Sequence, residues 1–119
     1  MFTKIKQTCE INEMALHDVV VSVPSYFTAE ERLALQDAAS IAGINLLRMY
    51  NESTANVMNY GIFRKSDLSM DTERLVGFVD FGHSKTSLFL AKIWKNKAEI
   101  VYEKNDRNLG VRNLDYNIL

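Results

Sequence analysis

An apolar, β-branched run at residues 18–23 restricts the fold of this chain more than any other stretch does. The run ends at Pro24, which lacks the backbone N–H that a strand needs, so we expect a buried strand that stops at Val23. A second short strand is predicted at residues 46–50. Helical signals separate and follow the two strands, and this β-α-β-α order favours parallel pairing between them.

Residues with strong positional preferences mark the helix boundaries. Thr28 is an expected N-cap, because Glu31 three residues later completes a capping box, and Gly43 suits a left-handed C-cap. A further helix is predicted from Glu52 to about residue 63. Near Met1, apolar residues recur on one face of residues 2–15 with lysines opposite, which predicts an amphipathic helix.

The second half of the chain has a different pattern. Residues 64–74 are polar and charged without periodicity, so they are the expected linker between two regions. Apolar or alternating runs then predict three strands, joined by short turns into an antiparallel meander, at residues 75–81, 86–94 and 98–103. A last short helix is expected after Gly110. The predicted fold class is therefore α/β.

Composition limits the classes of protein to consider. The 119 residues are 47% hydrophobic, which is enough for one ordinary core. A formal net charge of -1 gives no large field to attract nucleic acid or an anionic membrane, so neither is an expected partner. The single cysteine excludes an internal disulfide, no apolar run is long enough to span a bilayer, and Met1 does not open a signal peptide. We therefore expect a soluble, cytoplasmic protein.

The stretch from residue 78 to 85 is the strongest candidate for chemistry. An apolar strand delivers the carboxylate of Asp80 into a tight turn that contains Gly82. Small residues in such a turn let backbone amides approach a phosphate, and the carboxylate can position water around magnesium. Glu52, at the end of an earlier strand, could face the same cleft. An Asp-x-Gly turn also occurs in ordinary hairpins, so the turn alone leaves both interpretations open.

Ordered motifs across nearly the whole chain resemble the ATPase domain of the seventy-kilodalton heat-shock chaperones, the DnaK type. The matching stretches are VSVPSYF at 21–27, DAASIAG at 37–43, LR at 47–48, NESTA at 51–55, YG at 60–61, the Asp80 turn, and NLG at 108–110 followed by Asp115. The turn VDFGHS at 79–84 looks more like that of the larger hundred-and-ten-kilodalton relatives, which mainly act as nucleotide-exchange factors and holdases. The resemblance therefore favours that branch.

The resemblance implies a partial actin-like, ribonuclease-H-like fold. On this mapping residues 1–63 are the end of lobe I of the nucleotide-binding domain, 64–74 are the linker, and 75–119 are the start of lobe II. The full-length protein would then bind ATP or ADP with magnesium and assist protein folding as a chaperone. This chain alone would hold no nucleotide tightly.

The resemblance also implies roles for individual residues. Asp80 would order magnesium-bound water, and Glu52 would help to hold the hydrated metal or the attacking water, so both would act on the metal through water. Gly82, His83 and Ser84 would present backbone amides to the phosphates. His83 equally suits a solvated turn residue.

Several departures from the DnaK pattern weaken the case for hydrolysis. Lys85 stands where that type has a threonine near the γ-phosphate; it could compensate phosphate charge, but it cannot reproduce a hydroxyl. His83 and Ser84 replace two glycines, and Ser53 replaces a proline. The family's first phosphate loop, its catalytic lysine and its adenosine-binding segment have no counterpart here. We expect a weak ATPase in the full-length protein and no activity in this chain alone.

Partners are also implied. Pro24 and Arg32 match positions that relay the nucleotide state toward the substrate domain, although Arg32 also suits a solvated helix charge. The expected partners are a DnaK-type chaperone and unfolded client proteins. Exposed sheet edges and apolar faces predict that the chain self-associates, for example as a dimer with exchanged strands or helices.

Two alternatives from other classes stay open at this point. One is a non-catalytic interaction module with the same fold and a degenerate nucleotide pocket, which the lysine at position 85 favours. The other is a sugar kinase or actin relative. That alternative requires a sugar-binding motif or an actin-type adenosine segment, and neither is found.

Overall fold

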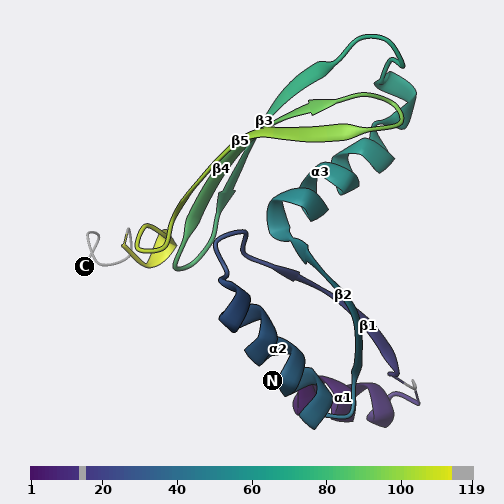
Figure 1. The fold of residues 1–119 in the computed structure, drawn as a ribbon, viewed down its shortest axis with the longest axis vertical. Coiled ribbons are helices and arrows are strands. Elements are labelled where there is room, and N and C mark those ends of the chain that lie inside the picture. Colours follow the sequence, from purple (N-terminus) through teal and green to yellow (C-terminus); the bar gives the residue numbers. More distant parts are fainter. Residues whose placement is uncertain (14–15, 114–119) are drawn as a thin grey trace. The chain divides into compact units, whose positions relative to one another are not determined.

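The computed structural model describes residues 1–13 and 16–113, and the chain forms two compact units, Met1–Glu52 and Ser53–Leu119. Both helices and strands are present, so the predicted α/β class is confirmed (Figure 1). The elements in chain order are α1 (Phe2–Ile11), β1 (Asp18–Val23), α2 (Ala29–Ile41), β2 (Asn45–Asn51), α3 (Glu52–Phe63), a 3-10 turn (Lys65–Asp67), β3 (Arg74–Phe81), β4 (Thr86–Ile93) and β5 (Ala98–Asp106).

The first unit contains a parallel pair of strands, β1 and β2. Parallel pairing was predicted and is confirmed, and β1 has the predicted bounds. The β2 strand extends one residue beyond the predicted range at each end. Side chains of Val23, Ala39 and Ile44 are buried and form the small core of this unit.

The helix between these strands begins and ends as its sequence indicates. The Thr28 side chain accepts a hydrogen bond from the Glu31 amide, and the Glu31 carboxylate accepts one from the Thr28 amide, so the capping box is confirmed. At the other end Gly43 has a φ of +67°, the left-handed conformation that favours glycine after a helix. The hydroxyl and the glycine therefore set the length of α2.

The first helix is shorter than its sequence pattern predicts. Helix α1 ends at Ile11 rather than at residue 15, and residues 14 and 15 lie outside the described ranges. None of its residues is buried: Ile11 is 82% exposed, and Cys9 is only half-buried. An apolar stripe predicts a buried face only where an element covers it, and within the first unit the stripe of α1 stays accessible.

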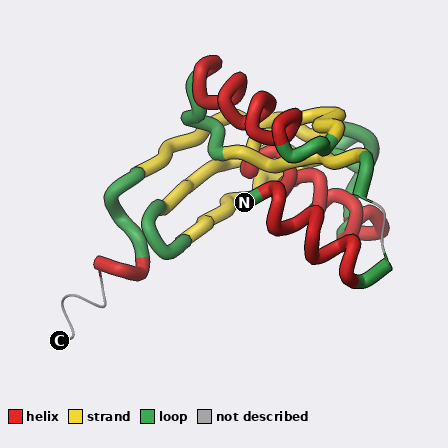
Figure 2. The backbone as a smooth tube through the Cα atoms, turned by 90° about the horizontal axis from the view of Figure 1, so that it is seen from below, coloured by secondary structure: helices red, strands yellow, loops and turns green. Residues whose placement is uncertain are grey.

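The second unit contains the antiparallel meander β3-β4-β5, as predicted (Figure 2). Strand β5 continues to Asp106, three residues past the predicted end. Its polar end is paired nevertheless, because Asn105 lies opposite Ser87 and Asp106 lies opposite Thr86. Backbone pairing rather than side-chain hydrophobicity holds the end of this strand.

The core of the second unit lies between α3 and the sheet. One cluster of buried side chains comes from α3, from the loop before β3 and from β4. Its members are Val57, Leu68, Phe89, Ala91 and Ile93. The rings of Phe78 and Phe89 stack with centroids 4.8 Å apart, and Tyr60 of α3 meets Phe78 edge-on at 5.7 Å. Leu68 belongs to the polar range 64–74, so that range contributes an anchor to this core.

Two further predictions concern boundaries. Along the chain the first compact unit ends at Glu52 and the second begins at Ser53, whereas the sequence pattern places a linker at residues 64–74. The assignment of the chain to two lobes stays a prediction. Residues 111–113 are helical, as expected after Gly110. Asp115, one of the matched motif residues, lies outside the described residues.

Candidate functional site

The turn between β3 and β4 holds five of the predicted site residues within one short segment. Asp80 is the last residue but one of β3, and its side chain is half-buried. The Gly82 amide donates a hydrogen bond to the Lys85 carbonyl oxygen at 2.9 Å, which closes the turn. His83 and Ser84 are exposed at its tip.

Lys85 lies against the candidate carboxylate. Its Nζ is 3.9 Å from Oδ2 of Asp80, and the two side chains are 19% and 38% exposed, respectively. Burial lowers the pKa of the Lys85 ammonium from its ordinary value, while the charge of Glu103 on β5 acts in the opposite direction. The turn therefore contains its own cation next to Asp80.

Residues 109–113 hold the turn from its other side. The amides of Val111 and Arg112 donate hydrogen bonds to the carbonyl oxygens of Gly82 at 3.0 Å and His83 at 3.1 Å. The approach is close because Gly110 has no side chain: a Cβ there would lie 2.3 Å from the His83 carbonyl oxygen. The carbonyl side of the turn is therefore occupied by protein.

The amide side of the turn is arranged differently. The Gly82 amide is used within the turn, whereas no backbone hydrogen bond between described residues uses the amides of His83 or Ser84. Adjacent backbone amides of this kind can bind an anion. The nitrogen of Ser84 nevertheless lies close to Gly110, since a Cβ there would be 2.7 Å from it. The presentation of the Gly82, His83 and Ser84 amides to phosphate stays a prediction.

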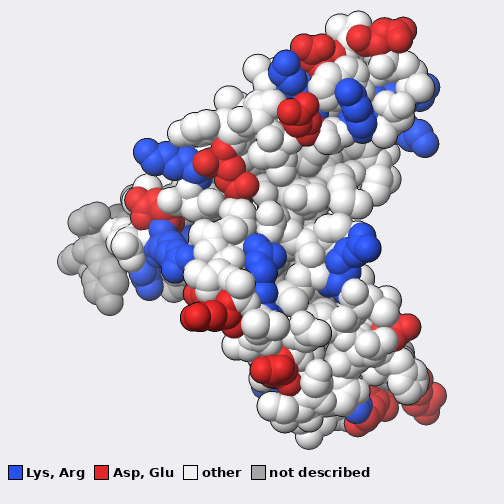
Figure 3. All heavy atoms as spheres, in the orientation of Figure 1, with Lys and Arg blue, Asp and Glu red and all other residues white. Residues whose placement is uncertain are grey.

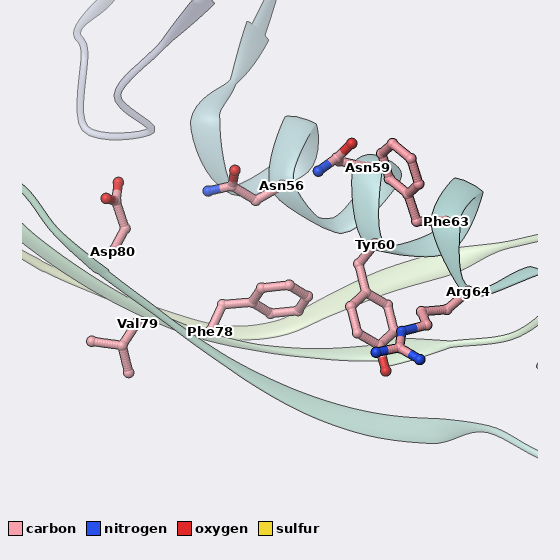
Figure 4. A pocket seen from close by; sticks show the side chains of 8 residues that line it. All are labelled: Asn56, Asn59, Tyr60, Phe63, Arg64, Phe78, Val79 and Asp80. Carbon is pink, nitrogen blue, oxygen red and sulfur yellow. The ribbon is translucent and has the colours of Figure 1, made fainter. Parts of the chain in front are cut away.

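A groove with a volume of about 460 Å³ lies between β3 and α3 in the second unit (Figure 4). Asp80 lies at one end of it, and Val79 points away from the helix, as period-two alternation along β3 requires. The opposite wall is α3, which contributes Asn56 and Asn59. These two amides were not singled out from the sequence, although their spacing of three residues places them on one helix face.

A buried hydrogen bond joins the start of α3 to β5. Ser53 is 3% exposed, and its hydroxyl donates to Oε2 of Glu103 at 3.1 Å. Ser53 occupies the position of the family's proline, so the departure noted from the sequence introduces a hydrogen bond. Glu103 is therefore half-buried and hydrogen-bonded, although it lies on a strand whose other charged residues include exposed ones such as Glu99.

Predicted residues of the first unit lie around the N-terminus of α2 and the end of β2. Arg32 donates from Nη2 to Oδ1 of Asn51 at 2.8 Å and from Nε to the carbonyl oxygen of Phe27 at 3.2 Å. It is half-buried, so it is a hydrogen-bonded side chain rather than a solvated charge. The Pro24 carbonyl accepts from the Phe27 amide at 3.1 Å, and Glu52 directly follows Asn51.

The predicted residues thus fall into two groups within separate units. Asp80, Gly82, His83, Ser84 and Lys85 lie together in the second unit, and Pro24, Arg32 and Glu52 belong to the first. In the second unit, Lys85 contacts Asp80 through an ion pair and Gly82 through a hydrogen bond, and in the first unit Arg32 bonds to Asn51, the residue before Glu52. A common cleft for Glu52 and Asp80 stays a prediction.

Among the described residues, no group of three or more His, Cys, Asp or Glu side chains is placed to hold a metal ion.

Lys and Arg side chains are interspersed with Asp and Glu on the face that Figure 3 shows, as the net charge of -1 leads us to expect. In the part of the chain that the structure describes, every helix is too short or too polar to cross a bilayer.

Comparison with known proteins supports the resemblance found in the motifs. The family model described as Hsp70 protein matches residues 1–119. A heat shock protein homolog of Candida glabrata is 40% identical over 94% of this chain, and the 97 kDa heat shock protein of Strongylocentrotus purpuratus is 41% identical over 98%. Heat shock 70 kDa protein 4L of Homo sapiens is 37% identical over 97%.

The matches cover 16%, 13% and 14% of those three relatives, so the chain spans a small part of their length. A parallel strand pair followed by an antiparallel meander is consistent with part of an actin-like ATPase domain. The family predicted from the motifs is confirmed, and this chain belongs to the Hsp70 protein family.

Proposed function

We propose that this chain is part of the nucleotide-binding domain of a heat-shock chaperone. The observation that carries the proposal is the segment around the β3–β4 turn, which contains the carboxylate of Asp80 and, a few residues later, the backbone amides of His83 and Ser84. A carboxylate and backbone amides in one turn suit a phosphate with its bound cation. Membership of the Hsp70 family supports a nucleotide as the phosphate-bearing ligand. In the full-length protein the ligand is ATP or ADP.

Magnesium fits this site only as a hydrated ion. One carboxylate lines the groove, and magnesium in nucleotide sites keeps several waters while it binds phosphate oxygens. Asp80 and Glu52 are the residues that we propose to orient those waters. The ion would neutralise the charge on the phosphates, and the amides of His83 and Ser84 would position the phosphate group.

The cellular role that we propose follows the larger relatives. The full-length protein acts as a nucleotide-exchange factor and holdase in the cytoplasm, and its partners are a DnaK-type chaperone and unfolded client proteins. Pro24 and Arg32 relay the nucleotide state in this proposal. Arg32 suits that role, because it links α2 to the last residue of β2, next to Glu52.

Calorimetric titration of the full-length protein with magnesium-ATP tests the nucleotide site. We expect Asp80→Asn to weaken the affinity about threefold, because a neutral amide orients metal-bound water poorly. Asp71→Asn is the matched control, since Asp71 is exposed in the loop before β3. Unchanged affinity and turnover in Asp80→Asn, relative to that control, would argue against the role of this carboxylate.

The second candidate function is a non-catalytic interaction module, which the ion pair between Lys85 and Asp80 favours. A scaffold with a degenerate pocket shows no saturable heat of binding when magnesium-ATP is added to the wild-type protein. Saturable binding favours the nucleotide-binding function instead. The same calorimetric experiment therefore distinguishes the two candidates.

We also propose that this chain by itself associates with a second copy. Large apolar side chains on the first unit are accessible: Val20 is 53% and Leu47 59% exposed. Val20 also lines an apolar groove of about 720 Å³, together with other residues of α1, β1 and α2. Exposed apolar surface and unpaired strand edges favour association between copies. Sedimentation that shows only monomer at high concentration would contradict this proposal.

A further inference from the structure

The most unusual feature of the β3–β4 turn is a lysine where the family's DnaK type has a small hydroxyl residue. Most of the Lys85 side chain is buried, with 19% exposed. Its stem lies against the turn, since a Cβ on Gly82 would be 3.8 Å from Cγ of Lys85. A buried stem restricts the positions that the ammonium can reach, so its charge is held close to Asp80.

The charges around this ammonium come from two strands. Asp80 of β3 lies 3.9 Å away, which is longer than a hydrogen bond, so the attraction is electrostatic. Glu103 of β5 also stabilises the charged lysine, while its own Oε2 accepts from Ser53. The Lys85 ammonium therefore places a positive charge beside Asp80, where the resemblance to the DnaK type implies a hydrated magnesium ion.

A divalent ion and an ammonium compete for the same carboxylate. Magnesium placed near Oδ2 of Asp80 meets the repulsion of Lys85, and no group of three potential ligands among the described residues offsets it. A lysine ammonium can instead act on phosphate directly as a point charge. The amides of His83 and Ser84 lie in the same turn and could contact the same phosphate.

We propose that Lys85 takes over part of the charge-neutralising role of magnesium, so that a nucleoside polyphosphate binds this site with little dependence on divalent metal. The inference rests on the nucleotide-binding function proposed above. It differs from that function in naming the cation that the protein itself supplies. The consequence is a nucleotide affinity that persists when magnesium is removed.

The experiment is a calorimetric titration of the full-length protein with ADP, in excess magnesium and again with a chelator. We expect chelation to weaken ADP binding by less than about tenfold in the wild type. In Lys85→Met, which keeps the length of the stem but removes the charge, we expect a loss on chelation that is about tenfold larger. Lys92→Met is the matched control, because Lys92 lies on the adjoining strand β4 and pairs with Glu73 at 3.5 Å.

Equal losses on chelation in the wild type and in Lys85→Met would overturn the inference while leaving the nucleotide-binding function intact. No saturable ADP binding to the wild type in either buffer would overturn both. If circular dichroism shows that Lys85→Met does not fold, Lys85→Arg and Lys85→Gln replace it. Lys85→Arg keeps the charge, so its loss of ADP affinity on chelation should equal that of the wild type. A loss in Lys85→Arg as large as that in Lys85→Gln would refute the role of the charge.

Discussion

Replacing Gly110 by alanine should release the contact that holds the β3–β4 turn. The added Cβ would lie 2.3 Å from the carbonyl oxygen of His83, and the nearest atoms are all backbone, so no side chain can rotate away. An ordinary carbon-to-oxygen contact is about 3.3 Å, so the two segments must separate by about 1 Å. The amides of Val111 and Arg112 would then lose their partners in the turn.

The expected cost follows from those two hydrogen bonds. Each hydrogen bond contributes about 1 kcal/mol net to stability, and over-packing destabilises the variant by up to about 1 kcal/mol more. We therefore expect Gly110→Ala to lower the free energy of unfolding of the second unit by about 2–3 kcal/mol. Gly61→Ala is the matched control, because nothing lies within 4 Å of a Cβ at Gly61 in α3. Alanine is favoured over glycine inside a helix by about 0.5–1 kcal/mol, so that variant should be neutral or more stable.

Urea unfolding followed by the fluorescence of Trp94, the single tryptophan of the chain, measures this difference within the second unit. Hydrogen exchange provides a local measurement: protection of the amides of Val111 and Arg112 should fall in Gly110→Ala and persist in Gly61→Ala. Unchanged stability and protection in Gly110→Ala would refute the steric reasoning. Equal losses in both variants would show that the cost does not come from the turn.

Three further substitutions test other parts of the fold. Thr28→Ala removes the N-cap of α2 and should cost about 1 kcal/mol in urea unfolding monitored by circular dichroism, whereas Thr28→Ser should be neutral. Phe89→Ala should cost about 3–5 kcal/mol in the Trp94 assay, because Phe89 is 1% exposed and stacked in the core; a loss below about 1 kcal/mol would contradict that packing. Ser53→Ala leaves Glu103 without the hydroxyl donor and should cost about 1–2 kcal/mol by the same assay, and an unchanged midpoint would show that the hydrogen bond contributes nothing.

Local signals in the sequence predicted elements whose bounds depend on backbone chemistry. The capping box at Thr28 and the left-handed Gly43 gave the start and end of α2, and the valine run gave β1. The polar end of β5 escaped prediction, because pairing with Thr86 and Ser87 leaves no hydrophobic pattern in the sequence. Periodicity predicted that α1 is an amphipathic helix, but whether its apolar face is buried depends on a neighbour that the pattern does not specify.

The candidate site was predictable only in part for a similar reason. A strand that delivers Asp80 into a glycine turn is visible in the sequence, and so is the family motif around it. The ion pair with Lys85 depends on the path of a side chain, and the contact of Gly110 depends on two segments meeting in space. The groove residues Asn56 and Asn59 had no signal except their helical spacing.

The topology of the two units also affects how quickly each can form. Strands β3, β4 and β5 pair with sequence neighbours through short turns, so closing each hairpin costs little chain entropy. Strand β1 pairs with β2 only after the chain has crossed over through α2, and the paired residues Asp18 and Asn45 are 27 residues apart. The valine-rich strand β1, an apolar segment of the kind that aggregates when unpaired, is therefore slower than the meander to find its partner during folding.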